Sequence, residues 1–388
     1  MVWFDMEQKR NIGQDQPSGE DEAGFGFTTR AAPDAIRGRG ARSNAVGRYE
    51  REQRLTVDDG WGGPEEWQGQ GRAIRTQVSV DASRSIIARN SSPDIGFDRS
   101  INPYRGCEHG CIYCFARPTH AWLGLSPGLD FETRLFMKPD AARLLEAELR
   151  KPGYGCRTVA MGTNTDPYQP LEREHGITRS VLQVLQRFNH PVGIVTKSAL
   201  IMRDIDILSD MATRGQAKVA LSVTTLDAGL ARRMEPRAST PERRLKAVRA
   251  LADAGIPVGV LAAPMIPSLN EPELERILEA ARDAGATEAG YIMLRLPLEI
   301  ADLFGEWLEE EAPNRAGRIM KLVREMRGGR AYDARFGLRM TGTGPYAALV
   351  AKRFRVATAR LGLNVRRLRL DTSRFAVPPA RGDQLRLF

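Results

Sequence analysis

The hydrophobic pattern of the chain changes near residue 97. From there on, short apolar runs alternate with stretches in which apolar residues recur every three or four positions. Such runs are typical of strands buried on both faces, and strands that alternate with helices form parallel sheets. The runs are RTVAMGT (157–163), PVGIVTK (191–197), KVALSVTT (218–225), PVGVLAAPM (257–265) and AGYIMLRL (289–296). With a first strand near residues 98–103, they predict six βα units in a partial or full barrel.

The stretches between the runs have the periodicity of amphipathic helices. They are TRSVLQVLQRF (178–188), MRDIDILSDMATRG (202–215), STPERRLKAVRALADAG (239–255) and NEPELERILEAARDAG (270–285). Asn270, followed by Pro272 and Glu273, favours a helix start, and Gly255 and Gly285 favour helix ends.

Beyond the last run the pattern predicts a cap beside the barrel, which could face nucleic acid. A helical pattern covers 300–326, an amphipathic helix is expected over 344–363, and NVRRLRL (364–370) is interpreted as a short basic strand. The divisions that we predict are a core over 76–300, an extension over 301–375 and a flexible tail over 376–388.

Residues 1–75 have almost no apolar periodicity and are predicted to form a disordered arm. They are rich in Gly, Gln, Asp, Glu and Arg, as in RGRGARSNAVGRYERE. This composition buries too little apolar surface to offset the chain entropy lost on folding. The Arg-Gly stretch could contact nucleic acid, and a plain linker is the alternative.

Composition indicates a cytoplasmic protein with a sizeable core, because 42% of its 388 residues are hydrophobic. No stretch approaches the roughly 20 continuous apolar residues of a membrane span, and the N-terminus lacks the order of a secretory signal. Four cysteines are too few for a disulfide framework, so three that lie close together indicate metal or redox ligands.

Positive charge is concentrated toward the C-terminus. The net charge is +9, and residues 351–388 carry ten Lys and Arg against two Asp. A basic segment of this kind suits a phosphate backbone, because each neutralised phosphate releases a condensed counterion. The alternative is a solvated tail that keeps the protein soluble.

Polar residues follow each predicted strand. The segments are TNTD (163–166), TKS (196–198), SVTT (222–225), APMIPS (263–268) and RLPLE (295–299). In parallel α/β folds the functional site lies at the carboxyl ends of the strands. The loop GCEHGCIYCF (106–115), which follows the first strand, belongs to the same rim.

Three of the four cysteines lie in that loop. Cys107, Cys111 and Cys114 have the spacing Cys-x3-Cys-x2-Cys, and Tyr113 directly precedes the last. Thiolates favour iron–sulfur clusters or zinc, and three thiolates on a four-iron cube leave one iron free to bind another molecule. The alternatives are a zinc site completed by His109 and a redox pair formed by Cys111 and Cys114.

This spacing, with an aromatic residue before the last cysteine, resembles the signature of the radical S-adenosylmethionine (radical SAM) superfamily. The resemblance implies a partial (β/α)6 barrel, similar to a TIM barrel, whose three cysteines hold a [4Fe-4S] cluster beside Tyr113. It also implies that S-adenosylmethionine (SAM) binds the fourth iron and is cleaved reductively, giving a 5′-deoxyadenosyl radical that abstracts hydrogen from the substrate. An electron donor such as flavodoxin or ferredoxin is then a partner.

Residues 97–300 resemble most the branch that includes spore photoproduct lyase, also called DNA-repair-photolyase-like. The stretches that carry this resemblance are GTNTDPYQPLE, VTKS, SVTT, MEPRASTPERRL and VLAAPMIP. In that branch a polar side chain after the second strand, a lysine after the third and a serine of the fourth contact SAM. By position these are Thr163 or Asn164, Lys197 and Ser222, whose ammonium and hydroxyl groups suit a carboxylate and a ribose.

One position departs from that pattern. Spore photoproduct lyase has a radical-quenching cysteine after the second strand, where this chain has Gly162. The spare thiol, Cys156, lies six residues earlier, which is about 20 Å along a strand, and is expected to be a small buried residue. The resemblance therefore leaves the substrate open.

Four charged residues of the rim could hold a substrate or act as acid/base groups, with helix capping and salt bridges as the structural alternative. They are Asp166, Glu172, Arg295 and Glu299. Of these, Arg295 and Glu299 are the pair that we predict to be catalytic.

The chain finishes with GDQLRLF. Gln384, Leu385, Leu387 and Phe388 resemble the short peptide by which bacterial replication and repair proteins dock on the DNA sliding clamp. A flexible tail would present Leu387 and Phe388 to an apolar pocket, while Gln384 supplies hydrogen bonds. The alternative is a tail that folds back and buries both apolar residues.

These observations lead to three hypotheses of function. The first is a radical SAM enzyme that acts on nucleic acid, in DNA repair or base modification. The second moves the same chemistry to a peptide or small molecule, and the basic tail only solvates the protein. The third is a non-catalytic, DNA-associated protein whose metal centre is structural and whose tail docks on the clamp.

Overall fold

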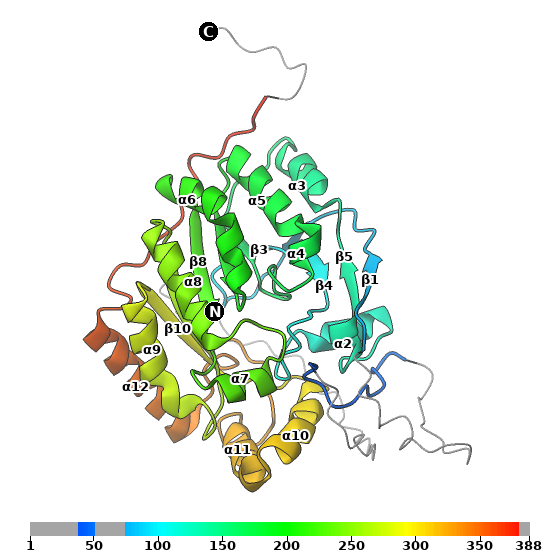
Figure 1. Cartoon of the computed structure of the whole chain (residues 1–388), viewed down its shortest axis with the longest axis vertical. Coiled ribbons are helices and arrows are strands. Elements are labelled where there is room, and N and C mark those ends of the chain that lie inside the picture. Colours follow the sequence, from blue (N-terminus) through cyan, green and yellow to red (C-terminus); the bar gives the residue numbers. More distant parts are fainter. Residues whose placement is uncertain (1–37, 51–73, 380–388) are drawn as a thin grey trace.

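A seven-stranded sheet forms the centre of the molecule, in the order β10-β9-β8-β7-β6-β3-β2. The computed structural model describes residues 38–50 and 74–379 (Figure 1). The parallel strands are β3 (Arg99–Ile101), β6 (Val159–Met161), β7 (Val192–Thr196), β8 (Ala217–Ser222), β9 (Val258–Met265) and β10 (Glu288–Met293). The six predicted strands are confirmed. Because β2 (Ile87–Arg89) pairs antiparallel with β3 at one edge and β10 ends the other, the barrel is partial.

Helices cover the outside of this sheet, as the amphipathic stretches predict (Figure 1). The crossover helices are α3 (Ala141–Leu149), α5 (Ile177–Arg187), α6 (Ile205–Thr213), α8 (Pro241–Asp253) and α9 (Leu274–Asp283). Shorter turns accompany them: α4 (Glu172–His175), η2 (Ala199–Asp204), α7 (Ala228–Met234) and η3 (Glu271–Glu273). Gly255 and Gly285 follow α8 and α9 with φ of 73° and 99°, so the predicted helix ends are confirmed. No helix within the described ranges is long and apolar enough to cross a membrane.

The region that starts at Asn270 is helical, but the asparagine side chain does not cap it. Asn270 Nδ2 donates hydrogen bonds to the carbonyl oxygens of Thr224 and Pro264, and its Oδ1 accepts one from Ile266 N. The residue therefore joins the loops after β8 and β9, a role that the local sequence pattern did not indicate.

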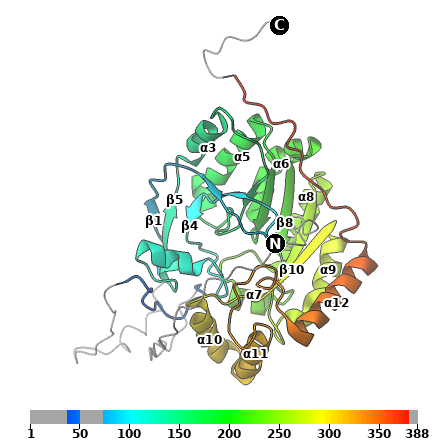
Figure 2. The same ribbon diagram turned by 180° about the vertical axis from the view of Figure 1, so that it is seen from behind.

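A second sheet, which the sequence pattern did not predict, lies beside the barrel. It contains β1 (Gln77–Val80), β5 (Arg134–Met137) and β4 (Tyr104–Arg105), in that order. Figure 2 shows it beside α2 (Asp130–Thr133), on the other side of the molecule from β10. Its strands have two to four residues and β1 is mostly exposed, so they are too short to display an alternating pattern.

The C-terminal region contains α10 (Ile300–Glu311), α11 (Pro313–Glu325) and α12 (Gly344–Leu361). The helices predicted over 300–326 and 344–363 are confirmed. α12 covers β10 and runs beside α9, where Arg353 Nη2 lies 2.6 Å from Glu275 Oε2 and the Phe354 ring lies 4.8 Å from that of Tyr291. This helix therefore covers the last strand of the sheet.

The prediction of a strand over 364–370 was wrong. Residues 364–379, called the strap below, have no regular secondary structure and cross the amino ends of the parallel strands. Leu368 N donates to the Glu288 carboxylate at 3.0 Å, and Asp371 N donates to Gly215 O at 2.9 Å. At the edge strand β10 a side chain takes the place of a strand partner: Asn364 Oδ1 accepts a hydrogen bond from Ala289 N at 2.8 Å, and Asn364 Nδ2 donates to Ala289 O at 3.0 Å. Arg366 and Arg367 of the strap are exposed. Through these contacts the strap lies at the end of the barrel opposite to the cysteine loop, and Figure 1 shows it running from α12 past α6.

The strap packs over His190, which titrates abnormally. His190 is fully buried, its Nε2 lies 2.9 Å from Tyr154 Oη, and the Phe375 ring meets it edge-on. Burial lowers the pKa of His190 to about 4.

The unfolded chain should therefore bind this proton at a higher pH than the folded chain, so stability falls as the pH falls from 7 to 5. We expect this group alone to lower the free energy of unfolding by about 2 kcal/mol over that range. Urea unfolding at both pH values measures the decrease in the free energy of unfolding. In His190→Gln this decrease should be smaller by the contribution of His190. An equal loss in both proteins would contradict this assignment.

Candidate active site

A cavity opens at the carboxyl ends of the parallel strands, where the polar segments predicted the site. Its empty volume, including the part open to solvent, is about 1170 Å³. The predicted residues that line it are Cys107, Cys111, Tyr113, Cys114, Thr163, Asn164, Asp166, Lys197, Ser222 and Arg295. The structure thus brings nearly all candidate residues together, although they are separated by up to 188 positions in the chain.

A buried ion pair supports the cysteine loop. Arg117, at the start of η1 (Arg117–Leu123), and Glu132 of α2 are both completely buried, and Arg117 Nη2 lies 2.5 Å from Glu132 Oε1. The same guanidinium donates to the carbonyl oxygens of Gly110 and Cys111, at 3.1 and 2.9 Å. A charged pair with all its donors used fixes the path of the loop.

Residues 38–50, which composition assigned to the disordered arm, pack against this loop instead. The main-chain nitrogens of Gly40 and Ala41 donate to the Glu132 carboxylate at 3.0 and 2.8 Å. A Cβ at Gly40 would lie 1.8 Å from Gly110 O, so only glycine allows this approach. Buried charge, which composition does not reveal, orders this segment.

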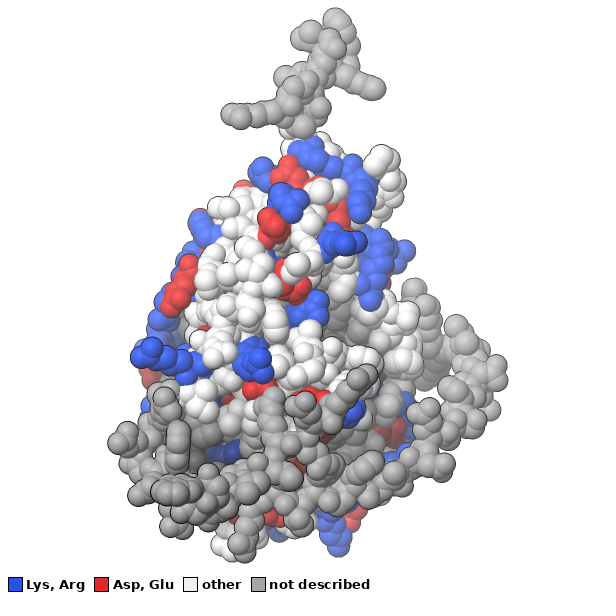
Figure 3. All heavy atoms as spheres, turned by 90° about the vertical axis from the view of Figure 1, so that its right-hand side faces the viewer, with Lys and Arg blue, Asp and Glu red and all other residues white. Residues whose placement is uncertain are grey.

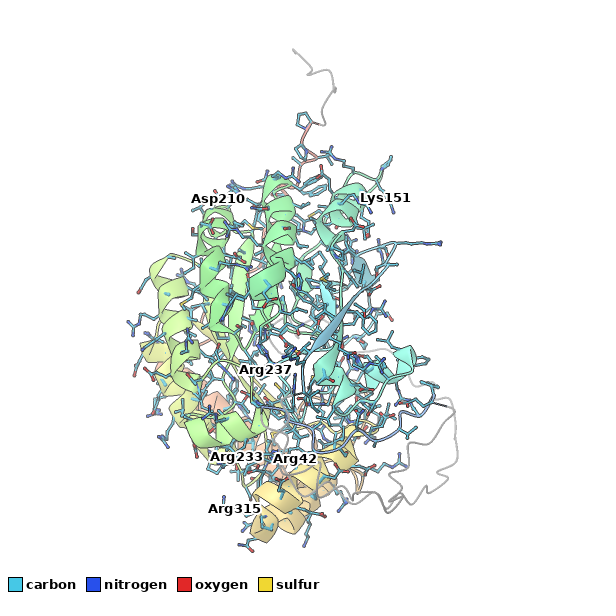
Figure 4. The ribbon with its side chains drawn as sticks, turned by 45° about the vertical axis from the view of Figure 1, so that its right-hand side comes forward. Arg42, Lys151, Asp210, Arg233, Arg237 and Arg315 are labelled. Carbon is cyan, nitrogen blue, oxygen red and sulfur yellow. The ribbon has the colours of Figure 1, made fainter. Side chains whose placement is uncertain are left out.

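Arg42 continues this contact toward α10. Its Nε lies 2.8 Å from Glu310 Oε2, and Arg233 Nε reaches Glu311 Oε2 at 3.1 Å. Figure 4 shows Arg42 and Arg233 beside α10 and α11. The segment after residue 38 and the end of α7 are therefore both tied to α10.

The segment MEPR (234–237), which starts at the last residue of α7, also contacts the cysteine loop. Ile112 N donates to Met234 O at 3.0 Å, and Arg237 N donates to His109 O at 3.3 Å. Arg237 Nη1 lies 3.2 Å from Glu108 Oε1, and Figure 4 shows this arginine near the centre of the molecule. The cysteine loop is therefore fixed on both sides by charged groups.

Glu235 of the same segment is a functional candidate that the sequence analysis missed. Its buried carboxylate accepts hydrogen bonds from Tyr113 Oη, from Thr224 Oγ1 and from the Arg244 guanidinium. Lys197 Nζ lies 3.5 Å away. Its signal in the sequence is its position within MEPRAS, a stretch that carries the family resemblance.

Lys197 and Ser222 lie in direct contact on the cavity wall. Lys197 Nζ donates to Ser222 Oγ at 2.5 Å and to Ala263 O at 3.3 Å. The ammonium also lies 5.6 Å from the centre of the Tyr113 ring. Burial lowers the pKa of Lys197 to about 8. The arrangement offers a cation with its neighbours fixed, suited to an anionic group.

Asp166 orients the loops after β6 and β7. Its carboxylate accepts hydrogen bonds from Thr196 Oγ1 and Lys197 N, both at 2.7 Å, and lies 3.3 Å from His109 Nδ1. Burial opposes its ionisation, but His109 and these donors lower the pKa of Asp166 overall. This contact at Nδ1 fixes the orientation of the His109 ring.

The three thiols suit a cluster better than a single metal ion. Burial raises the pKa of Cys107 and Cys111 well above the ordinary thiol value, and a bound metal centre would supply the positive charge that favours their thiolates. Within the described residues, no three His, Cys, Asp or Glu side chains converge on one ion. All three thiols line one cavity, and in a four-iron cube each cysteine would bind a different iron.

Glu172 and Glu299 do not line the cavity. Glu172 is buried behind it, where it accepts hydrogen bonds from Tyr104 Oη at 2.5 Å and Thr178 N at 2.9 Å. Glu299 lies 3.0 Å from Arg48 Nη1 in a partly exposed ion pair. The structure therefore separates Glu299 from Arg295, which is buried at the cavity with the Phe115 ring centre 4.3 Å from its Cζ.

The position of the missing cysteine is closed to any side chain. Gly162 has φ of 80°, and a Cβ there would lie 1.8 Å from Val195 O. Cys156 precedes β6 at the amino ends of the strands, is half-buried rather than buried as expected, and burial raises its pKa to about 11. No described thiol outside the loop therefore reaches the cavity.

The pattern of the Radical SAM superfamily matches residues 101–281, and the chain belongs to this superfamily. An uncharacterized protein of Mycobacterium tuberculosis (strain H37Rv) is 36% identical over 230 residues, which are 59% of this chain and 68% of the relative. An uncharacterized protein of Methanocaldococcus jannaschii is 27% identical over 196 residues, covering 50% of this chain and 70% of the relative.

The fold is that of spore photoproduct lyase. One mutant of that enzyme matches with a TM-score of 0.53 and 16% identity over 81% of this chain and 87% of its own. Another mutant, solved with AdoMet and dinucleoside spore photoproduct bound, matches with a TM-score of 0.52 and 16% identity over 74% and 80%. The chain is thus a radical SAM enzyme, a class that uses a [4Fe-4S] cluster and SAM.

Proposed function

We propose that this radical SAM enzyme acts on nucleic acid. The observation that carries the proposal is the set of groups that line one cavity. The three thiols of the cysteine loop line it together with Lys197, whose ammonium is held by Ser222. The exposed ring of Phe115 and the buried guanidinium of Arg295 lie side by side at the same cavity. When bound, the two cofactors supply radical chemistry that begins with the abstraction of a hydrogen atom. Aromatic rings and arginines together suit bases and phosphates.

In this proposal each group of cavity residues has its own role. Cys107, Cys111 and Cys114 hold the cluster, and Lys197 and Ser222 bind the carboxylate of SAM. Tyr113 lies between these groups, with its hydroxyl fixed by Glu235, and Thr163 or Asn164 contributes a polar contact to the cofactor.

A nucleic-acid substrate is favoured by the fold neighbour, which was solved with dinucleoside spore photoproduct bound. The closed position at Gly162 indicates a different reaction, because a quenching thiol cannot be placed there. The alternative substrate, a peptide or small molecule, keeps the same radical chemistry.

The basic strap is not the substrate-binding surface in this proposal, since it lies at the other end of the barrel. On the described part of the face shown in Figure 3, Lys and Arg are interspersed with Asp and Glu rather than gathered in one patch. Recognition of the substrate is therefore assigned to the cavity and its rim.

Three further elements of the proposal concern partners and location. We place the enzyme in the cytoplasm, with a flavodoxin or ferredoxin as electron donor. Docking on the DNA sliding clamp through Gln384, Leu385, Leu387 and Phe388 also stays a prediction, and these four residues lie outside the described part of the chain.

The test measures 5′-deoxyadenosine made by anaerobically reconstituted protein with dithionite and SAM. Single-stranded DNA, duplex DNA, RNA and a peptide mixture are added separately. We expect one of the nucleic acids to stimulate its formation, and the double variant Arg366→Gln with Arg367→Gln to respond like wild type. Stimulation by peptides alone would assign the enzyme to the alternative substrate class.

A further inference from the structure

Arg295 is a buried cation at the cavity without a partner among the residues that the structure describes. It follows β10, lines the cavity and is only 8% exposed. No described carboxylate lies within ion-pair distance of its guanidinium, and no described group accepts a hydrogen bond from it. Burial lowers the pKa of Arg295 to about 10, which leaves it charged at neutral pH.

Groups of both signs surround Arg295, and Asp94 is the carboxylate among them. The charged groups that act on it include two further arginines, Arg327 and Arg339. Arg327 is buried and donates to the carbonyl oxygens of Leu294 and Leu338, both at 2.8 Å. The nearby acid, Asp94, is already paired with Arg339 at 2.5 Å. Asp94 is therefore not available as a direct partner for Arg295.

No nitrogen of Arg295 is among the described buried polar atoms that lack a hydrogen-bond partner, so the guanidinium reaches the cavity, where an anionic ligand can meet it. Phe115 shapes that site, because its ring centre lies 4.3 Å from Arg295 Cζ while the ring itself is 39% exposed. A guanidinium held against an aromatic ring keeps its planar set of donors available to an oxyanion. Phosphate and carboxylate groups match this donor set.

We propose that Arg295 binds a backbone phosphate of the nucleic-acid substrate and thereby places the neighbouring nucleotide in the cavity. The inference rests on the proposed function. The carboxylate of SAM is the other source of such an anion, but Lys197, Ser222 and Glu235 form a separate group that already provides a cation for it. Phe115 offers its exposed ring to the base beside that phosphate.

The experiment compares the reconstituted wild-type protein with Arg295→Gln, under anaerobic conditions with SAM present. The probe is a fluorescent single-stranded ten-nucleotide DNA, read by anisotropy, and a second probe has the same sequence with a neutral methylphosphonate backbone. We expect the variant to bind the charged probe about tenfold more weakly and to lose about 0.7 from the slope of log K against log salt. Neither effect should occur with the neutral probe.

Two matched variants and one further measurement make the outcome specific. Arg295→Lys should keep most of the salt slope, and Arg367→Gln, which removes the same charge at the other end of the barrel, should bind like wild type. SAM affinity is measured by equilibrium dialysis on each protein. A loss of SAM affinity as large as the loss for DNA would assign the anion to the cofactor and overturn the inference.

Failure of the inference is distinguishable from failure of the proposed function. Equal DNA binding by wild type and Arg295→Gln would overturn the role of Arg295 while leaving a nucleic-acid enzyme in place. No DNA or RNA binding by the wild type would overturn both.

Thermal unfolding separates binding from a structural role. Arg295→Met keeps the volume but removes a buried charge that has no partner among the described residues, so it should melt at the same temperature as wild type or higher. A lower melting temperature together with unchanged DNA binding would make Arg295 a structural residue.

Discussion

Replacing Cys111 with alanine is expected to abolish the formation of 5′-deoxyadenosine. Two thiolates would then remain for a cube that needs three, so the cluster should be lost along with the iron that binds SAM. The loop itself should persist, because its fixed contacts use main-chain atoms, such as Cys111 O with Arg117 Nε at 2.9 Å and Ile112 N with Met234 O at 3.0 Å. Iron content, cluster absorbance and product formation are measured on the same preparation.

Cys156→Ala is the matched control, because it makes the same chemical change at the amino end of β6. Cys156 is half-buried and does not line the cavity, so iron content and SAM cleavage should equal those of wild type. A Cys111→Ala protein with a full cluster would contradict the ligand assignment. A wild type that holds zinc and no iron would favour the non-catalytic hypothesis.

Replacing Glu235 with glutamine is expected to lower the free energy of unfolding by about 3–5 kcal/mol, the range for breaking a buried charged pair. The carboxylate joins Tyr113, Thr224 and Arg244, with Lys197 at 3.5 Å. A neutral amide leaves two cations uncompensated and turns a donor toward groups that are themselves donors. Denaturant unfolding of the variant and the wild type, measured side by side, gives the difference.

SAM affinity should fall in the same variant, because Lys197 and Tyr113 lose the group that positions them. Glu242→Gln provides the comparison, since Glu242 is an exposed glutamate of α8 that pairs only with Lys246 one turn away, and we expect no measurable change. A Glu235→Gln protein that unfolds like wild type would show that the network does not hold the cavity wall.

The sequence by itself determined the six parallel strands, their order and the place of the site. Strands buried on both faces appear as continuous apolar runs, and a parallel sheet must bring their carboxyl ends to one rim, so neighbours along the sheet follow from neighbours along the chain. This is why Lys197 and Ser222, from consecutive strands β7 and β8, could be assigned to one group and are found in contact at 2.5 Å. The cysteine loop is local and needed no folding to be identified.

Only the tertiary structure decided which charges support that site. Tyr113 and Glu235, 122 positions apart, meet because elements distant in the sequence pack together. Arg117 and Glu132, 15 positions apart, meet because η1 and α2 pack together, and no periodicity encodes either pair. Charged segments of similar composition also came to lie at opposite ends, with residues 38–50 under the cysteine loop and the strap at the amino ends of the strands.

Arg295 and Glu299 lie only four residues apart in the sequence, yet the tertiary structure separates them. Between them Leu298 has φ of 54°, and α10 begins directly after Glu299, so the chain turns and sends one side chain into the cavity and the other to Arg48. Periodicity and spacing fix what is local or repeated along the chain, whereas desolvation and pairing of individual charges depend on how the whole chain packs.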